Sequence, residues 1–442
     1  MDAAAPRACT AGGVVLFRTS TRIVPAALTA CSTRPRTRPC TMRATQDHPA
    51  GSKHALLVII LAQLLGTSLW FSVNSAAEDL MRQWASGPAS IGVLTIATQL
   101  GFIIGTLSFA LSGLADRFAA HRIFASCAIV GAACNLGFAV FADGVASGLV
   151  WRFLVGLSLA GIYPIGMKLV VRWAPQHAGK ALAWLVGMLT LGTALPQGIK
   201  ALGAALPWQM PILVASGLAC IAALMILRLG PGAQRPGGAP TRLAVGAVWQ
   251  AFAVKDFRAA TLGYFGHMWE LYAMWTLTPL LIAQAGLAQA LGMHPAALAF
   301  CVIAAGAVGC VVGGQLSSRL GSARVAAVAL LLSALCCAAF PLVGAWSAPA
   351  TVALMLLWGA SVVADSPQFS ALAARACPPG LVGSALSMQN AIGFAITVVA
   401  IGLTTQLVET LGLQIAWVLL PGPLLGLVGL WPLWRRARAG TG

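Results

Sequence analysis

Charged and titratable side chains lie inside long apolar stretches of this sequence. Arg152 stands in WRFLVGLSLAGIYPIGMK, His267 and Glu270 in GYFGHMWELYAMW, and Asp365 in WGASVVADSPQFS. An arginine keeps its proton and offers a planar fork of donors to a carboxylate or another oxyanion. A carboxylate taken out of water can exchange a proton near neutral pH. Together these residue types suit the proton-coupled movement of a small anion.

The composition predicts that the bilayer is the solvent of this chain. Of the 442 residues, 59% are hydrophobic and only 8% are charged, whereas soluble proteins have roughly a quarter charged. A membrane-spanning helix needs about 20 apolar residues. Twelve stretches meet this requirement, at residues 55–77, 90–112, 123–142, 146–168, 180–203, 208–229, 259–285, 295–317, 323–344, 348–370, 383–408 and 412–434. We therefore expect an all-α polytopic membrane protein with twelve transmembrane helices.

The stretch around Arg152 recurs in the second half of the chain. Gly156 corresponds to Gly359, Ser158 to Ser361 and Pro164 to Pro367, at a constant offset of 203 residues. Such a repeat is typical of transporters built from two related units. It predicts two pseudo-symmetric six-helix halves, 54–229 and 259–434. They are joined by a proline- and glycine-rich linker at 230–258 and followed by a basic tail at 435–442.

The net charge of +17 reflects topology and does not indicate a nucleic-acid partner. Basic residues gather in alternate loops, which predicts that both termini are cytoplasmic in an inner or plasma membrane. Residues 1–53 are basic and lack a long apolar run. They fit a transit peptide, a tail for anionic lipid or, as we favour, an extension upstream of a start at Met42. In each case we expect disorder.

No motif points to an enzyme, a cofactor or a metal. The eleven cysteines show no metal-ligand spacing, and nucleotide and phosphate-binding motifs are missing from the sequence. We expect a monomer in the lipid bilayer whose partners are a small-molecule substrate and protons.

Two loops carry a family resemblance. SGLADRFAAHR (112–122) and GGQLSSRLGSAR (313–324) resemble the loop motif of the major facilitator superfamily. Arg152, Gly156 and Gly161 resemble its helix-4 motif, whereas its efflux motif in helix 5 is incomplete here. The resemblance implies gating roles for Asp116, Arg117 and Arg319.

In that family, helices 1, 4, 7 and 10 line a central cavity. The polar residues of those helices are therefore our candidates for substrate binding, with Glu270 and Asp365 as candidates for proton coupling. The substrate-binding candidates are Gln63, Trp70, Asn74, Arg152, Tyr163, His267, Tyr272 and Gln368. Three alternatives stay open: an Arg152–Glu270 ion pair that only holds the halves together, interhelical hydrogen bonding by helix 1, and a packing role for His267.

The resemblance and the residues together predict a secondary active transporter that works by alternating access. Uptake of a small organic or inorganic anion by proton symport is the first interpretation. Proton-driven efflux of a drug or metabolite is the alternative, because helix 7 is rich in aromatic residues. A nitrate or nitrite carrier is less favoured. That family places arginines in helices 2 and 8, and helices 2 and 8 of this chain contain none. A passive channel would have little need of titratable groups at mid-membrane depth.

Overall fold

The computed structural model describes residues 49–173, 178–203, 205–232, 245–378 and 381–439. Residues 47–442 form one compact unit. The predictions for the basic leading segment, for a start at Met42 and for much of the linker lie outside the described residues.

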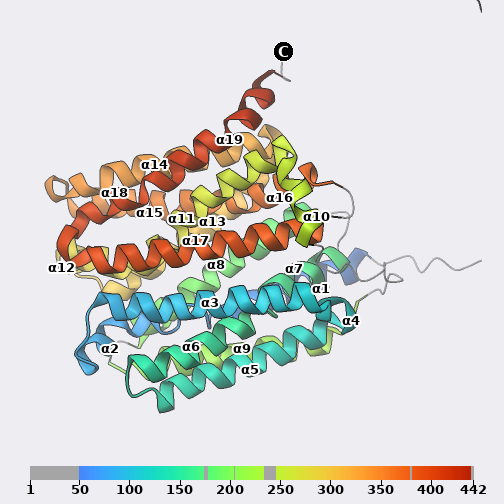
Figure 1. Ribbon diagram of the computed structural model, residues 1–442. Helices are drawn as coiled ribbons and strands as arrows, with labels where there is room; N and C mark the ends of the chain where they lie inside the picture. The colour runs from blue at the N-terminus through green and yellow to red at the C-terminus, as the bar shows by residue number, and fades with distance from the viewer. Residues whose placement is uncertain (1–48, 174–177, 204, 233–244, 379–380, 440–442) are drawn as a thin grey trace, which may run out of the picture. The chain divides into compact units, whose positions relative to one another are not determined.

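Helices account for nearly all of the described chain, and the long ones run side by side (Figure 1). The first half contains α1 (Pro49–Thr67), η1 (Asn74–Ala76), α2 (Ala77–Gln83), α3 (Pro88–Ser112), α4 (Leu114–Arg117), α5 (Ala120–Phe141), α6 (Val145–Leu159), α7 (Tyr163–Trp173), α8 (Ala178–Leu202) and α9 (Gln209–Leu229). The second half contains α10 (Val245–Ala253), α11 (Lys255–Gln284), α12 (Leu287–Leu291), α13 (Pro295–Leu320), α14 (Ser322–Ala339), η3 (Phe340–Ala345), α15 (Ala348–Ala364), α16 (Ser366–Ala376), α17 (Val382–Leu411), η4 (Gly412–Ile415), α18 (Ala416–Leu419) and α19 (Pro421–Ala439).

Each of the twelve predicted segments coincides with a helix or a broken helix. Within the described residues, nine spans are long and apolar enough to cross a membrane, and one of them, Val382–Arg436, covers both α17 and α19. The first helix falls short because its apolar part, Lys53–Thr67, ends early. Helix α11 is long, but polar and charged side chains interrupt it.

Of the predicted continuous helices that are broken, two have breaks that obey the repeat. One break separates α6 from α7 at residues 160–162, and the other separates α15 from α16 at Asp365. Each following helix has proline as its second residue, Pro164 in α7 and Pro367 in α16. Proline lacks the N–H that would continue the preceding helix but suits the first turn of a new one.

The repeated glycines bring equivalent helices into close contact. A Cβ on Gly156 of α6 would lie 2.0 Å from the carbonyl oxygen of Thr98 in α3. A Cβ on Gly359 of α15 would lie 1.9 Å from the carbonyl oxygen of Val302 in α13. Small residues at such positions let membrane helices approach backbone to backbone.

Two helix pairs join the first half of the chain to the second. Helix α8 packs along α13, and α3 packs along α17 (Figure 1). Between α3 and α17, the Gln99 side-chain amide donates to the Thr397 hydroxyl over 3.1 Å. The buried residues of these helices include threonines and glutamines as well as apolar side chains. Buried charged groups are costlier to place than these, so they mark the candidate site.

Candidate functional site

A small cavity lies between the two halves of the chain. The centre of a water molecule can occupy about 30 Å³ of it, which is room for water. Helices α7, α8, α11, α15, α16 and α17 contribute its lining. The lining residues are Tyr163, Val186, Leu189, Thr190, Tyr264, His267, Met268, Leu271, Tyr272, Trp275, Val363, Ser366, Ser370, Asn390 and Phe394. All three tyrosines of the chain are among them.

Besides the three tyrosines, His267 is the group in this described lining that can carry a charge. Its Nδ1 lies 2.8 Å from Oδ1 of Asp365, and both side chains are 1% exposed. The contact is an ion pair when the imidazole is protonated. Both ring nitrogens are buried and lack a hydrogen bond of regular geometry among the described residues, and Nε2 has no ion-pair contact either. With Nδ1 held by Asp365, Nε2 is the nitrogen left for a ligand in the cavity.

Aromatic rings from both halves close the cavity toward α1. Trp70 lies in the turn after α1, and its ring centroid is 5.6 Å from that of Tyr272 and 5.8 Å from that of Phe394. Its indole N–H donates to the Gln99 side chain over 3.1 Å. Tyr272 also packs against Trp275 at 5.2 Å. Trp70 therefore contacts cavity-lining residues without being one itself.

Arg152 does not face the cavity. Its guanidinium donates to the carbonyl oxygens of Leu69 and Trp70, and more weakly to the side chains of Ser72 and Asn135. The two carbonyls belong to the turn that follows α1, where the regular helix has ended. Arg152 thus satisfies acceptors that a broken membrane helix leaves without partners. In this structure the guanidinium is engaged by these groups, and binding of a substrate anion by Arg152 stays an untested prediction.

Glu270 is also held within its own half. Its Oε1 accepts from the Ser333 hydroxyl and the Trp358 indole N–H, each over 2.5 Å, and from the Cys337 thiol over 3.2 Å. These partners come from α14 and α15. The Arg152–Glu270 ion pair considered from the sequence is therefore not formed in this structure, because each group has other partners.

Arg152 and Glu270 occupy related places. Arg152 lies on the fourth predicted transmembrane segment and reaches the first and third, while Glu270 lies on the seventh and reaches the ninth and tenth. Each charge thus ties together the equivalent three helices of its half. The two charges occupy different positions within these sets, since Met355 stands 203 residues after Arg152. Opposite charges that join equivalent sets of helices are a structural asymmetry between the two halves.

The described part of the chain matches a known family model. The model described as Major Facilitator Superfamily matches residues 59–402. The chain belongs to the major facilitator superfamily.

Individual relatives within this superfamily are distant. A niacin transporter of Acinetobacter baylyi is 28% identical over 162 residues, which is 34% of this chain and 34% of the relative. A metabolite transport protein of Haemophilus influenzae is 31% identical over 133 residues, 29% of this chain and 30% of the relative. The chain thus matches about a third of the length of each of these curated relatives.

A solved structure shares the fold. It is a bacterial homologue of the human lysosomal transporter Spinster, in an inward-facing and unoccupied conformation. The TM-score is 0.62 at 14% identity, over 88% of this chain and 96% of that chain. Such a likeness shows the fold of this superfamily member and no more.

Three of the predicted substrate-binding residues line the cavity: Tyr163, His267 and Tyr272. Gln63 is fully buried against Gly166 of α7, and both polar atoms of its amide lack partners among the described residues. Gln368 is buried in the first turn of α16, where its N–H donates to the Asp365 carbonyl.

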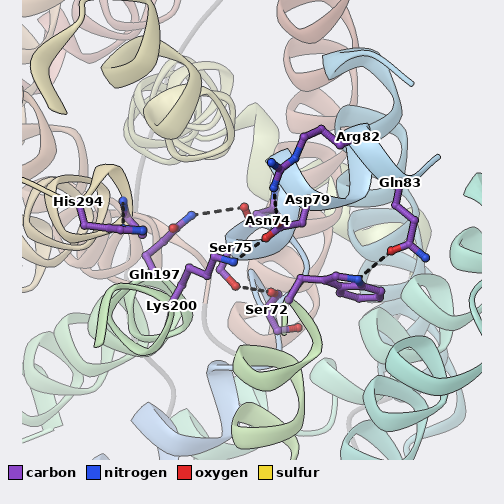
Figure 2. A network of polar contacts seen from close by, with 11 residues as sticks. Ser72, Asn74, Ser75, Asp79, Arg82, Gln83, Gln197, Lys200 and His294 are labelled. Atoms are coloured by element: carbon purple, nitrogen blue, oxygen red, sulfur yellow. Dashed lines mark hydrogen bonds and ion pairs between the residues drawn. The ribbon is translucent and has the colours of Figure 1, made fainter. Parts of the chain in front are cut away.

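Asn74 belongs to a polar network at the opposite end of the bundle from α4 and α10 (Figure 2). The side-chain amide of Asn74 donates to the Thr95 hydroxyl over 2.9 Å, and its backbone carbonyl accepts from the Gln197 side-chain amide over 3.4 Å. Nearby, Lys200 of α8 pairs with Asp79 of α2 at 2.5 Å. This network braces the chain after the break in the first helix.

The predicted gating residues lie at helix ends: Asp116 and Arg117 in the short helix α4, and Arg319 in the last turn of α13. The Asp116 side chain falls outside the described part of the structure. Arg117 and Arg319 are exposed. Lys168 of α7 donates to the Ala115 carbonyl over 2.5 Å, which ties the fourth transmembrane segment to the loop that carries the family motif.

The sequence analysis missed several lining residues, among them Tyr264, Thr190 and Asn390. A signal for Tyr264 existed, since it precedes His267 by one helical turn. Thr190 and Asn390 lie on the fifth and eleventh predicted segments. These are not among helices 1, 4, 7 and 10, which the family resemblance implies to line the cavity. Among the described residues, no group of three or more His, Cys, Asp or Glu side chains is placed to hold a metal ion.

Proposed function

We propose that this member of the major facilitator superfamily couples protons to the uptake of a small organic anion by alternating access. The observation that carries the proposal is His267. Its imidazole is buried between the Asp365 carboxylate and the cavity, and its Nε2 has no partner among the described residues.

The proposed coupling uses one proton on His267. A protonated imidazole donates from both nitrogens, so it can hold Asp365 through Nδ1 and a substrate anion through Nε2. An anion in the cavity stabilises the imidazolium, because a nearby opposite charge favours the charged form. When the substrate leaves, the second negative charge is gone, and the proton is released more easily. Proton and anion therefore move together.

The lining favours a flat, partly aromatic anion. Tyr163, Tyr264, Tyr272, Trp275 and Phe394 surround His267 with rings. Aromatic side chains stack on planar ligands and bury much apolar area. The partial similarity to a niacin transporter agrees with an aromatic carboxylate as the substrate class.

The spaces between the halves differ at the two ends of the bundle. A crevice of about 320 Å³, lined by Thr106, Phe109, Lys168 and Ser384, opens beside the family loop motif. At the other end, near Asn74 and His294, the space is about 40 Å³. The loop charges predict that the wider crevice is cytoplasmic. Opening of the narrow end would expose His267 to the outside.

The test is accumulation in proteoliposomes. We expect nicotinate or benzoate to concentrate inside when the outside is made acidic, and a protonophore to abolish the accumulation. Equilibration without accumulation, at any pH gradient, would contradict coupling.

Efflux remains the second candidate because the cavity is so rich in aromatic residues. The same vesicles separate the two functions. Exclusion of an amphipathic cation such as ethidium under the opposite gradient, with no movement of the carboxylates, would identify an antiporter.

A further inference from the structure

A crevice of about 450 Å³ lies between α8 of the first half and α13 of the second, away from the central cavity. Its lining residues are Lys180, Ala183, Trp184, Val311, Val312, Gly314, Gln315, Leu316, Ser318 and Arg319. The helices touch beneath it, since a Cβ on Gly314 would lie 2.6 Å from the Cβ of Ala183.

The lining is divided along the helix axes into a polar end and an apolar end. Gln315, Ser318 and Arg319 belong to the last turns of α13, and Lys180 belongs to the first turn of α8. Farther from this end, Trp184 is 46% exposed and Val312 is 45% exposed. The polar end therefore meets the membrane surface, and the apolar end faces the bilayer interior.

The polar end is positive. Lys180 and Arg319 come from different halves of the chain, and no described lining residue is acidic. The neighbouring sequence at 174–177, Ala-Pro-Gln-His, supplies no acid either. The positive dipole end of α8 and the negative dipole end of α13 both lie here, so the positive charge of this end comes from the two side chains. Two cations from packed helices repel each other unless an anion lies between them.

We propose that this crevice binds one anionic phospholipid. The headgroup phosphate lies between Lys180 and Arg319, where a lysine and an arginine give charge-assisted hydrogen bonds. The acyl chains lie along Trp184, Val312 and Leu316. A soluble anion would use the cations alone, whereas a lipid also covers the exposed apolar end of the crevice.

Such a lipid bridges the two halves of the transporter. It favours the conformation in which α8 and α13 are packed at this end, because only then do both cations contact one phosphate. The lipid composition of the bilayer therefore shifts the balance between the conformations of alternating access, although the lipid does not contact the substrate cavity. The proposal does not depend on what the cavity binds.

Native mass spectrometry of the full-length protein tests the proposal with defined lipids. We expect phosphatidylglycerol to bind to the wild-type protein as a tight first lipid, and phosphatidylcholine to bind weakly. Lys180→Gln/Arg319→Gln should bind that first phosphatidylglycerol roughly 30-fold more weakly, since each basic residue near the surface contributes about fivefold.

The matched control is Arg172→Gln/Arg228→Gln, which removes the same charge from exposed positions outside the crevice. It should bind phosphatidylglycerol like the wild type. Lys180→Arg/Arg319→Lys keeps the charge and should also bind. Equal affinity of the two double glutamine variants would overturn the site. Equal stabilisation of the wild type against heat by inorganic phosphate alone would show a soluble-anion site instead of a lipid site.

Discussion

At the scale of single residues, the buried charges divide into two kinds. Arg152 and Glu270 each make several hydrogen bonds inside one half of the chain, although Nε of Arg152 has no partner among the described residues. His267 leaves one nitrogen without a partner beside the cavity. A satisfied buried charge organises structure, whereas an unsatisfied one next to a cavity is placed to meet a ligand.

Arg152 is expected to matter for stability and not for substrate affinity. Arg152→Leu removes the guanidinium donor from the Trp70 carbonyl, and it leaves the Leu69 carbonyl with the Ser72 hydroxyl alone. Each lost bond to a charged group costs about 1.5–3 kcal/mol. We expect lower yield and a lower midpoint of thermal unfolding, measured by size-exclusion chromatography after heating. The surviving protein should keep the wild-type KM. Normal stability with a raised KM would contradict this and would indicate that Arg152 binds the substrate. The control is Arg172→Leu, at an exposed position.

Asp79 predicts a dependence of stability on pH. Burial alone would raise its pKa, but the hydrogen bonds and charges of Lys200 and Arg82 outweigh burial and hold the pKa below its usual value. A carboxyl whose pKa is lower in the folded state stabilises the fold above its unfolded pKa. That contribution is lost as the pH falls through the folded value. The wild type should therefore be more heat-stable than Asp79→Asn at pH 7, and the difference should begin to shrink as the pH falls below about 4. A difference that persists at low pH would contradict this role.

At the scale of elements, helix α11 shows what the sequence could not settle. Helical spacing places Gly263, Gly266, His267 and Glu270 on one face, and the sequence predicts that His267 and Glu270 serve the cavity. In the structure, Gly266 packs against α19 and Glu270 binds α14 and α15, while His267 alone of these lines the cavity. Buried residues surround the whole helix, so no polar stripe identifies the side that faces the cavity.

The repeat and the helix positions, by contrast, could be predicted. The close contacts and the helix starts depend on single residues, namely Gly156, Gly359, Pro164 and Pro367. Glycine permits close approach of two helices, and proline favours the first turn of a helix. The partners of Arg152 were beyond prediction, because the carbonyls that it binds exist as free acceptors only after the first helix breaks. Sequence spacing does not reveal which backbone groups will be unsatisfied.

The glycine contacts give a prediction for helix packing. Gly156→Ala and Gly359→Ala each place a methyl group within 2.0 Å of a backbone carbonyl oxygen, so the helices must separate. We expect each to lower the free energy of unfolding by about 1–3 kcal/mol, measured as a lower midpoint of thermal unfolding. Gly217→Ala is the control, since no atom lies within 4 Å of a Cβ there. Similar midpoints for all three variants would contradict the packing argument.

At the scale of the whole molecule, membrane orientation remains a prediction from loop charges. In a cysteine-free background, Leu320→Cys should react with an impermeant thiol reagent only from the cytoplasmic side. Asp143→Cys should react only from outside; both positions are exposed. Reaction of Leu320→Cys in intact cells would place the loop motifs outside and reverse the orientation.

The central claim is that His267, positioned by Asp365, couples the proton to the substrate. The direct measurement is proton entry into proteoliposomes, reported by an internal pH dye, when the best-accumulated aromatic carboxylate is added outside. The wild type and Glu270→Gln, which keeps an acceptor for Ser333 and Trp358, should both acidify the interior. His267→Gln should exchange substrate in counterflow yet carry no proton. Proton entry that persists in His267→Gln, or that is lost in Glu270→Gln while counterflow continues, would contradict the account.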